Sequence, residues 1–386
     1  MRSAPVPTLG ATATAQLRDP RDAEVALFQR FPELIGRLPW APIGRYPTPV
    51  EPFRLADVPH AAEIWVKRED ISAERYGGNK VRTLEGHLGR ALARGDHTLW
   101  ATGAFGSNHA LCAALHGARL GLAVGVSLFP QPPTVTAKAN LRATLATTPA
   151  IYGMPHVTLL PWAMGRLMLR RGEAVMTPGG AIPIGALGHV SAGLELAGQI
   201  AAGQCPAFRH LVVAVGSTCT SAGLVLGLAL AKALGIGPAS APHVHAVGIG
   251  PWPVTSKAAI LWLARRTLRH LEALLGHRLP VAARELGAGL TTVGDRIGKG
   301  YGFPTLDGAA AARAFAAAGG PALDEVYTAK SGAGLLAQLD LDGPQVFWAT
   351  KSTRPLAAAS ADQIARATPQ MRAWLARPEP TLERVR

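Results

Sequence analysis

The sequence predicts an α/β fold, in which the strands of mostly parallel sheets alternate with helices. Two features of the chain carry this prediction. Short apolar or alternating segments typical of strands recur along it, and segments with apolar residues at helical spacing lie between them. Strands that alternate with helices imply parallel βαβ units. The chain also has 386 residues, which is enough for two ordinary domains and a large core.

The N-terminal half of the chain shows this alternation after a leader. Residues 22–39 form a short amphipathic segment, and the proline-punctuated residues 45–53 are extended. Three strands are predicted in this half, at 62–70, 97–104 and 122–129. Apolar residues at helical spacing predict a helix after the first strand: Val81, Leu84, Leu88 and Leu92. A second helix, 109–121, ends at a glycine.

The C-terminal half repeats the pattern. Three further strands are predicted, at 211–215, 244–250 and 345–350. Three further helices are predicted, at 224–234, 256–276 and 308–320. The chain has no tandem repeat and no long linker, so any domain boundary lies inside the α/β pattern.

The composition is that of a globular protein with a basic surface. Hydrophobic residues make up 48% of the chain and charged residues 17%. The formal net charge of +14 comes from scattered basic residues, with no basic tract interleaved with aromatics. We therefore expect a solvated, arginine-rich surface and no nucleic-acid partner.

Cysteine usage and the N-terminus point to the cytoplasm. Cys112, Cys205 and Cys219 share no metal or redox spacing, and so few cysteines suit a reducing compartment. The N-terminus has no apolar core of a signal peptide. The uncharged segment 211–231 has six small or hydroxyl residues at its centre, so a strand, a polar loop and a buried helix explain it better than a membrane span.

A single lysine stands where a loop becomes a helix. Lys80 follows two glycines and Asn79, a residue that can cap the helix and so place Lys80 in its first turn. A cation at that position opposes the helix dipole, and both this field and desolvation lower the pKa of a lysine. These effects would make Lys80 a reactive amine; the alternative is a loop lysine that reaches water.

Two polar turns are candidate anion sites. In GAFGSNHA, the residues Ser107, Asn108 and His109 open a helix after a strand, although an ordinary helix cap is the alternative. Residues 216–223 form a second strand-to-helix loop, with hydroxyls on Ser217, Thr218, Thr220 and Ser221. Hydroxyls and backbone N–H groups at a helix N-terminus suit a phosphate, whereas the alternative is a plain polar turn. The spacings GxSxG, GxGxxG and GxxxxGK[ST] are absent.

Two tyrosines in glycine-rich segments, Tyr301 and Tyr327, complete the candidate site. Tyrosines in loops are common, so this pair gains weight only beside the other motifs. The 12 histidines show no metal-binding spacing, and we expect no metal.

Four motifs resemble, in the same order, those of the D-cysteine desulfhydrase and 1-aminocyclopropane-1-carboxylate deaminase family. They are VKREDISAERYGGNKVRTLE, GAFGSNHA, GYGFP and VYTAKSGAGL. That family belongs to the tryptophan synthase β-like group of pyridoxal-phosphate enzymes. The resemblance extends from about Leu38 to about Pro355.

The resemblance implies two open, twisted α/β domains with pyridoxal 5'-phosphate in the cleft between them. The large cofactor-binding domain would comprise residues 1–73 and 191–386, with an N-terminal extension at 1–37. Residues 74–190 would form a small inserted α/β domain. A homodimer is also expected.

The resemblance further assigns roles to individual residues. Lys80 would hold the cofactor covalently and act in catalysis with Ser107, Tyr301 and Tyr327. Ser107, Asn108 and His109 would line the substrate side. The other residues expected to bind the cofactor are Asn79, Asn108, Ser217, Thr218, Cys219, Thr220, Ser221, Gly223, Thr328 and Thr350.

The chain departs from the family pattern in two places. Thr218 and Cys219 stand where glycines are common. Near the C-terminus the chain reads WATKST where the family often has His-Thr-Gly-Gly, so that Lys351 replaces a glycine close to the ring. These changes bear on the substrate more than on the cofactor.

The activity implied is elimination and deamination of a small amino acid to a keto acid and ammonia. The SNH and VYT segments resemble the D-cysteine desulfhydrase branch, because the cyclopropane deaminases carry a Gln after Ser-Asn and a Glu after the second tyrosine. One alternative is a 1-aminocyclopropane-1-carboxylate deaminase or another lyase, dehydratase or racemase of the same cofactor group. The other is a catalytically silent homologue that binds cofactor or amino acid.

Overall fold

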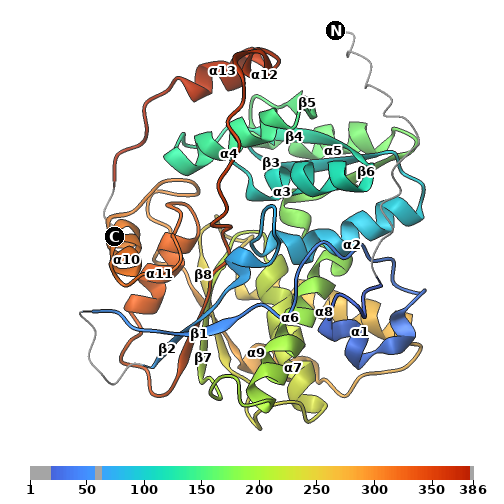
Figure 1. Cartoon of the computed structure of the whole chain (residues 1–386), viewed down its shortest axis with the longest axis vertical. Helices are drawn as coiled ribbons and strands as arrows, with labels where there is room; N and C mark the ends of the chain where they lie inside the picture. Colours follow the sequence, from blue (N-terminus) through green and yellow to red (C-terminus); the bar gives the residue numbers. More distant parts are fainter. Residues whose placement is uncertain (1–18, 57–62, 383–386) are drawn as a thin grey trace.

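The protein is built around two sheets, which a computed structural model describes for residues 19–56 and 63–382. In Figure 1 the four-stranded sheet lies in the upper part of the molecule and the six-stranded sheet in the lower part. Strands alternate with helices along the chain, which confirms the predicted α/β class. The predicted leader lies largely outside the described residues.

The larger sheet has the strand order β1-β2-β10-β7-β8-β9. All neighbouring pairs are parallel except β1 and β2. Its strands are β1 (Val50–Phe53), β2 (Ile64–Lys67), β7 (His210–Val215), β8 (His243–Gly248), β9 (Leu290–Val293) and β10 (Gln345–Trp348). The central strands are apolar along nearly their whole length, as expected for a parallel sheet buried on both faces.

The smaller sheet has the order β5-β4-β3-β6 and is entirely parallel. Its strands are β3 (Thr98–Ala104), β4 (Ala123–Phe129), β5 (Ala150–Gly153) and β6 (Glu173–Met176). The central strand β3 is buried at every residue. The sequence pattern predicts β3 and β4, whereas it misses the short, half-exposed edge strands β5 and β6.

Helices cover both sheets. Those of the N-terminal half are α1 (Ala26–Arg30), α2 (Lys80–Ala93), α3 (Asn108–Gly117), α4 (Val135–Ala146), α5 (Leu160–Met168) and α6 (Pro183–Ala201). Those of the C-terminal half are α7 (Cys219–Ala233), α8 (Lys257–Leu275), α9 (Ala283–Ala288), α10 (Leu306–Ala317), α11 (Thr328–Leu336), α12 (Ala361–Ala365) and α13 (Pro369–Leu375). The segment 211–231 comprises most of β7, a turn and most of α7. None of the described helices is long and apolar enough to cross a bilayer.

Helices α6 and α7 pack closely against each other through glycines. A Cβ on Gly193 of α6 would come within 2.9 Å of Gly227 of α7, and one on Gly223 of α7 would come within 2.3 Å of the His189 Cβ. Only glycine allows this approach. The predicted role of Gly223 in cofactor binding therefore finds no support in its position, because this residue serves the contact between the two helices.

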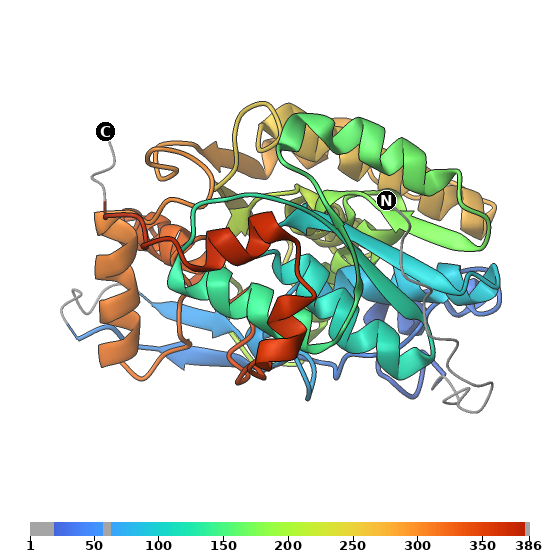
Figure 2. The ribbon, with the colours of Figure 1, turned by 90° about the horizontal axis from the view of Figure 1, so that it is seen from above.

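The C-terminal helices return to the smaller sheet. Figures 1 and 2 both place α12 and α13 beside α4. The Trp374 ring of α13 meets the Phe105 ring edge-on at 5.4 Å, and Met371 lies in the same apolar cluster. The division of the chain into domains at 73 and 190 stays a prediction.

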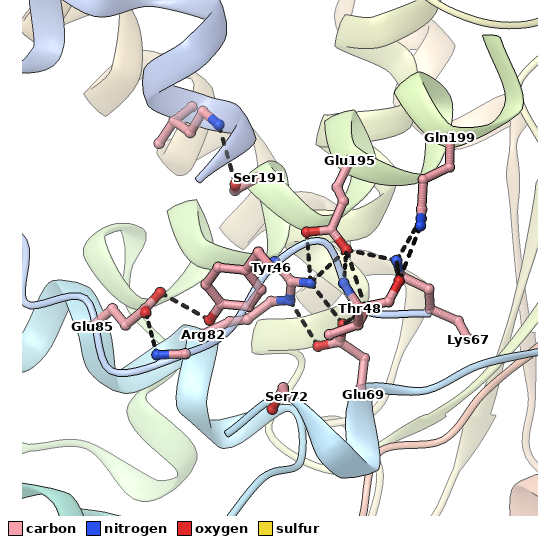
Figure 3. A network of polar contacts seen from close by, with 12 residues as sticks. Tyr46, Thr48, Lys67, Glu69, Ser72, Arg82, Glu85, Ser191, Glu195 and Gln199 are labelled. Carbon is pink, nitrogen blue, oxygen red and sulfur yellow. Dashed lines mark hydrogen bonds and ion pairs between the residues drawn. The ribbon is translucent and has the colours of Figure 1, made fainter. Parts of the chain in front are cut away.

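A buried network of charged side chains fixes the start of α2. Arg82 donates to both Glu69 and Glu195, and Lys67 donates to Glu195 at 2.6 Å (Figure 3). Burial disfavours the ionised carboxylate of Glu195, but Arg82 and Lys67 outweigh this effect and lower its pKa to about 2. The network ties α2, which begins at Lys80, to α6 and to the larger sheet.

Replacing Glu195 by glutamine should lower the free energy of unfolding by about 3 kcal/mol or more, because Arg82 and Lys67 would then share only Glu69 in a buried site. Urea unfolding measures this change. The matched control is Glu74→Gln, since Glu74 pairs with Arg45 on the surface with both side chains 68% exposed. That substitution should cost less than about 1 kcal/mol. Equal effects of the two substitutions would contradict the prediction.

Candidate active site

A cavity of about 720 Å³ lies where the two sheets face each other. Gly103 and Ala104 at the carboxyl end of β3 line one side, and Ala214 and Val215 at the carboxyl end of β7 line the other. Ligands of open α/β sheets bind at such carboxyl ends. The volume is within the range of roughly 300–1,000 Å³ that is usual for small-molecule sites.

Most of the predicted site residues line this cavity. They are Asn79, Lys80, Ser107, Asn108, His109, Ser217, Thr218, Cys219, Thr220, Ser221, Tyr301, Tyr327 and Thr350. Segments that lie far apart in sequence thus meet at one place. Gly223 and Thr328 are not among the lining residues.

The Lys80 amine lies in the cavity at the first residue of α2. Burial lowers its pKa, and it makes no ion pair with any described residue. The preceding Gly78 has φ +90°, and a Cβ there would lie 2.7 Å from the Thr350 oxygen, so this turn requires glycine. An unpaired amine with a lowered pKa has the properties of a nucleophile.

Asn79 occupies the N-cap position of α2, as predicted, but its side chain makes no capping hydrogen bond. Its Nδ2 donates to Thr220 Oγ1 at 2.8 Å, and its backbone N–H donates to the backbone carbonyl oxygen of Thr350 at 3.0 Å. Asn79 therefore links the start of α2 to the start of α7.

The turn at the start of α3 presents an oriented amide. Asn108 Oδ1 accepts hydrogen bonds from Tyr76 OH at 3.0 Å and from Asn140 Nδ2 at 2.8 Å. Because the oxygen is held by these two donors, its NH₂ group is left to donate elsewhere. Ser107 caps the helix by accepting from the Ala110 N–H at 3.2 Å.

His109 is buried at the cavity wall without a hydrogen-bond partner on either ring nitrogen among the described residues. Burial holds its pKa well below the usual value, and the nearby charge of Lys80 acts in the same direction. The ring is therefore neutral and can donate or accept one hydrogen bond with a ligand.

The loop between β7 and α7 has the form of an anion cradle. Thr218, where glycine is common in the family, has φ +66°, a conformation that costs a non-glycine residue about 1–2 kcal/mol. The Ser221 hydroxyl is buried at the cavity wall and lacks a partner among the described residues. Burial raises the pKa of Cys219 to about 11, so this thiol stays neutral.

The two predicted tyrosines form a pair. Their hydroxyl oxygens are 2.6 Å apart, and both rings lie at the cavity wall. Burial raises the pKa of Tyr301 to about 12 and that of Tyr327 well above its usual value. Both phenols are therefore neutral, and since one O–H is used between them, the other is available to a ligand.

Thr328, also expected to bind the cofactor, is not among the residues that line the cavity. Its hydroxyl donates to Asp324 Oδ1 at 2.7 Å and accepts from the Asp324 N–H at 2.7 Å. Thr328 therefore fixes the start of α11, while Thr350 remains at the cavity wall.

Sequence reasoning missed several residues of the site. Tyr76 and Asn140 orient Asn108, and Thr177 carries a buried hydroxyl without a partner among the described residues. Asn140 lies inside an ordinary helix, where nothing in the pattern marks it. Lys351 is visible in the sequence only as a departure from the family, and the structure places it at the cavity wall.

The outer part of the cavity is apolar. It is formed by Leu160, by Val254, which is 47% exposed, and by Trp262, which is 57% exposed. Among the described residues no group of three or more His, Cys, Asp or Glu side chains is placed to hold a metal ion.

Comparison with known proteins places the chain among relatives of similar length. A family model described as pyridoxal-phosphate dependent enzyme matches residues 42–349. The chain is 33% identical over 329 residues to nocardicin C-9' epimerase from Nocardia uniformis subsp. tsuyamanensis. This alignment covers 83% of this chain and 94% of the relative. It is also 33% identical over 336 residues to D-cysteine desulfhydrase from Salmonella paratyphi A. That alignment covers 82% of this chain and 93% of the relative.

Solved structures agree with these matches. An ACC deaminase homologue superposes with a TM-score of 0.68 and 26% identity, covering 84% of this chain and 94% of that chain. A threonine deaminase has a TM-score of 0.53 at 18% identity, covering 86% of this chain and 98% of that chain, and so shows the fold alone.

Proposed function

Since this chain belongs to the pyridoxal-phosphate-dependent enzymes, in the family of D-cysteine desulfhydrase and 1-aminocyclopropane-1-carboxylate deaminase, we propose that it eliminates and deaminates a small amino acid. D-cysteine is the first substrate to test. One D-cysteine and one water would give one pyruvate, one sulfide and one ammonia. The observation that carries the proposal is the meeting of an unpaired amine, an anion cradle and a neutral phenol pair in one cavity.

The residues at the cavity wall fit pyridoxal phosphate. The Lys80 amine would hold the aldehyde carbon, and the start of α7 with the Ser221 hydroxyl would hold the phosphate. The Asn108 NH₂ group is a suitable donor to the phenolic oxygen. When bound, the cofactor supplies an electron sink for the α-carbon of the substrate.

The chain's own groups would carry the proton transfers. The Lys80 amine, with its lowered pKa, would take the proton from the substrate α-carbon. The phenol pair would donate a proton to the leaving sulfur, which both tyrosines can do because they stay protonated. His109 and Ser107 would orient the substrate.

The proposal is tested by adding D- and L-amino acids to the purified, cofactor-loaded protein and measuring keto acid, sulfide and ammonia. Equal amounts of pyruvate, sulfide and ammonia from D-cysteine are expected. A protein that binds cofactor and releases no keto acid from any amino acid would overturn the proposal and support a catalytically silent homologue.

The apolar outer part of the cavity favours a second candidate, the epimerisation of a bulkier amino acid. Leu160, Val254 and Trp262 offer more apolar surface than a cysteine side chain can use. One relative at 33% identity is named an epimerase. Interconversion of enantiomers without release of ammonia, followed by chiral chromatography, would support this candidate over elimination.

Two further expectations belong to this proposal. We expect a homodimer, which light scattering on the eluting protein would test. We also expect a cytoplasmic protein, in keeping with three free, buried cysteines.

The Ser221→Ala substitution should weaken cofactor binding by roughly 10- to 100-fold, because one hydrogen bond to a charged phosphate is worth about 1.5–3 kcal/mol. Ser221 is a sharper choice than Thr218 or Thr220, since the hydroxyls of these threonines already bond within the protein. Spectroscopic titration of the apoprotein measures the affinity. Ser127→Ala is the matched control, because Ser127 is buried on β4 away from the cavity. An unchanged affinity in the Ser221 variant would exclude this hydroxyl from the phosphate site.

A further inference from the structure

Lys351 brings a second amine into the cavity. It lies just after β10 and lines the cavity wall together with Lys80. Its Nζ donates to Tyr76 OH at 2.8 Å and to Asn140 Oδ1 at 3.4 Å. Nζ also lies 5.0 Å from the centre of the Tyr76 ring.

These contacts close a ring of four side chains. Lys351 donates to Tyr76, Tyr76 donates to Asn108, and Asn140 both donates to Asn108 and accepts from Lys351. The ring holds the long lysine chain in one place beside the start of α3. Because an ammonium group has three N–H bonds and the ring uses two, one N–H remains for a ligand.

Burial lowers the pKa of Lys351, and the carboxylates of Asp324 and Glu325 favour its charged form without forming an ion pair with it. Lys351 makes no ion pair with any residue that the structure describes, and no Asp or Glu is found among the residues that line the cavity. A partly buried cation without a carboxylate in contact favours an anionic ligand beside it. The cavity therefore offers two amines and no negative charge.

We infer that Lys351 binds the carboxylate of the amino-acid substrate. This inference rests on the proposed function, in which Lys80 holds the cofactor and the start of α7 holds the phosphate. Of the two lysines among the described residues that line the cavity, Lys351 is then the one to which no part of the cofactor is assigned. Its position beside Asn108 puts it at the end of the cavity where Ser107 and His109 lie, so the carboxylate would be held by the ammonium group and the turn at α3 together.

The test compares an amino acid with its amide. Binding of alanine and of alaninamide, in the enantiomer that the wild-type protein prefers, is followed by the change in the visible spectrum of the bound cofactor. Neither compound carries a leaving group on its β-carbon, so binding is measured apart from elimination. Lys351→Met keeps an apolar chain of similar length against the Tyr76 ring and removes the charge.

The wild-type protein is expected to prefer alanine over alaninamide. The Lys351→Met substitution should lower the affinity for alanine by about 10- to 100-fold. It should change the affinity for alaninamide by no more than about twofold. Lys351→Gln, which can still bond to Tyr76 and Asn140, should show the same selective loss. Lys138→Met is the matched control, because the Lys138 amine bonds to the Arg377 oxygen outside the cavity and its loss should change neither affinity.

Equal losses for both ligands in the Met and Gln variants would overturn the inference, since they would mean that Lys351 only positions Asn108. Retention of the preference for alanine in Lys351→Gln would overturn it as well. If Lys351→Met loses its cofactor, the Gln variant decides the question. A wild-type protein whose cofactor spectrum responds to no amino acid would instead contradict the proposed function, and this outcome is distinct from the others.

Discussion

Replacing Lys80 by alanine is expected to abolish the covalent attachment of pyridoxal phosphate and, with it, all measurable turnover. Two roles are lost together, because the same amine would hold the cofactor and move the proton at the substrate α-carbon. Proton transfer alone contributes about 10²–10⁴ to a rate. Borohydride reduction of the loaded protein followed by peptide mapping measures the attachment directly, independently of activity.

The cavity provides an internal competitor for this experiment. Lys351 is also an amine at the cavity wall, but it is engaged by Tyr76 and Asn140, whereas the Lys80 amine makes no hydrogen bond with a described residue. A Cβ built on Gly179 would lie 2.3 Å from Ser217 Oγ and 3.5 Å from Lys80 Nζ, so Lys80 is the amine beside the loop between β7 and α7. We therefore expect the label on Lys80 in the wild-type protein. A label on Lys351 in the wild-type protein would contradict both the assignment of Lys80 and the inference about Lys351.

The fold could be predicted where a segment has one exposed face or a short apolar run. The predicted segments overlap the strands β2, β3, β4, β7, β8 and β10 and the helices α2, α3, α7, α8 and α10. Helix α6 was missed because nearly all of its residues are buried, so it has no polar stripe to give a helical period. The short helices α12 and α13 depend on tertiary packing, through contacts such as that between Trp374 and Phe105.

The sequence predicts which motifs meet in the cavity better than it predicts which single residues of those motifs line it. Each quoted motif contributes residues to the cavity wall, because loops at the carboxyl ends of parallel strands must meet. Gly223 and Thr328 are not among the lining residues, and a motif does not reveal which side of a helix faces the cavity. The partners of Asn108 come from α4 and from the loop before α2, and no local pattern links them.

Tyr327→Phe is expected to lower kcat for elimination by about 10²–10⁴, with cofactor binding and amino-acid binding unchanged. The phenol lies next to the loop between β7 and α7, since a Cβ on Gly216 would come within 3.3 Å of the Tyr327 ring. Its raised pKa keeps it protonated, so it can donate to a leaving group throughout the neutral range. Stopped-flow spectroscopy would show normal binding of the substrate followed by a stalled reaction.

The hydrogen bond between the two hydroxyls makes Tyr301→Phe an informative companion. If Tyr301 donates to Tyr327, then Tyr327 provides the free O–H, and loss of Tyr301 should reduce kcat less than loss of Tyr327. Tyr152→Phe serves as the matched control, because Tyr152 lies on the edge strand β5 away from the cavity and its loss should leave kcat unchanged. The competing explanation is that Tyr327 only packs against the loop between β7 and α7, which phenylalanine would do equally well. A Tyr327→Phe enzyme with kcat within twofold of the wild-type value would establish that packing role, and the proton at the leaving group would then have to come from another group at the cavity wall.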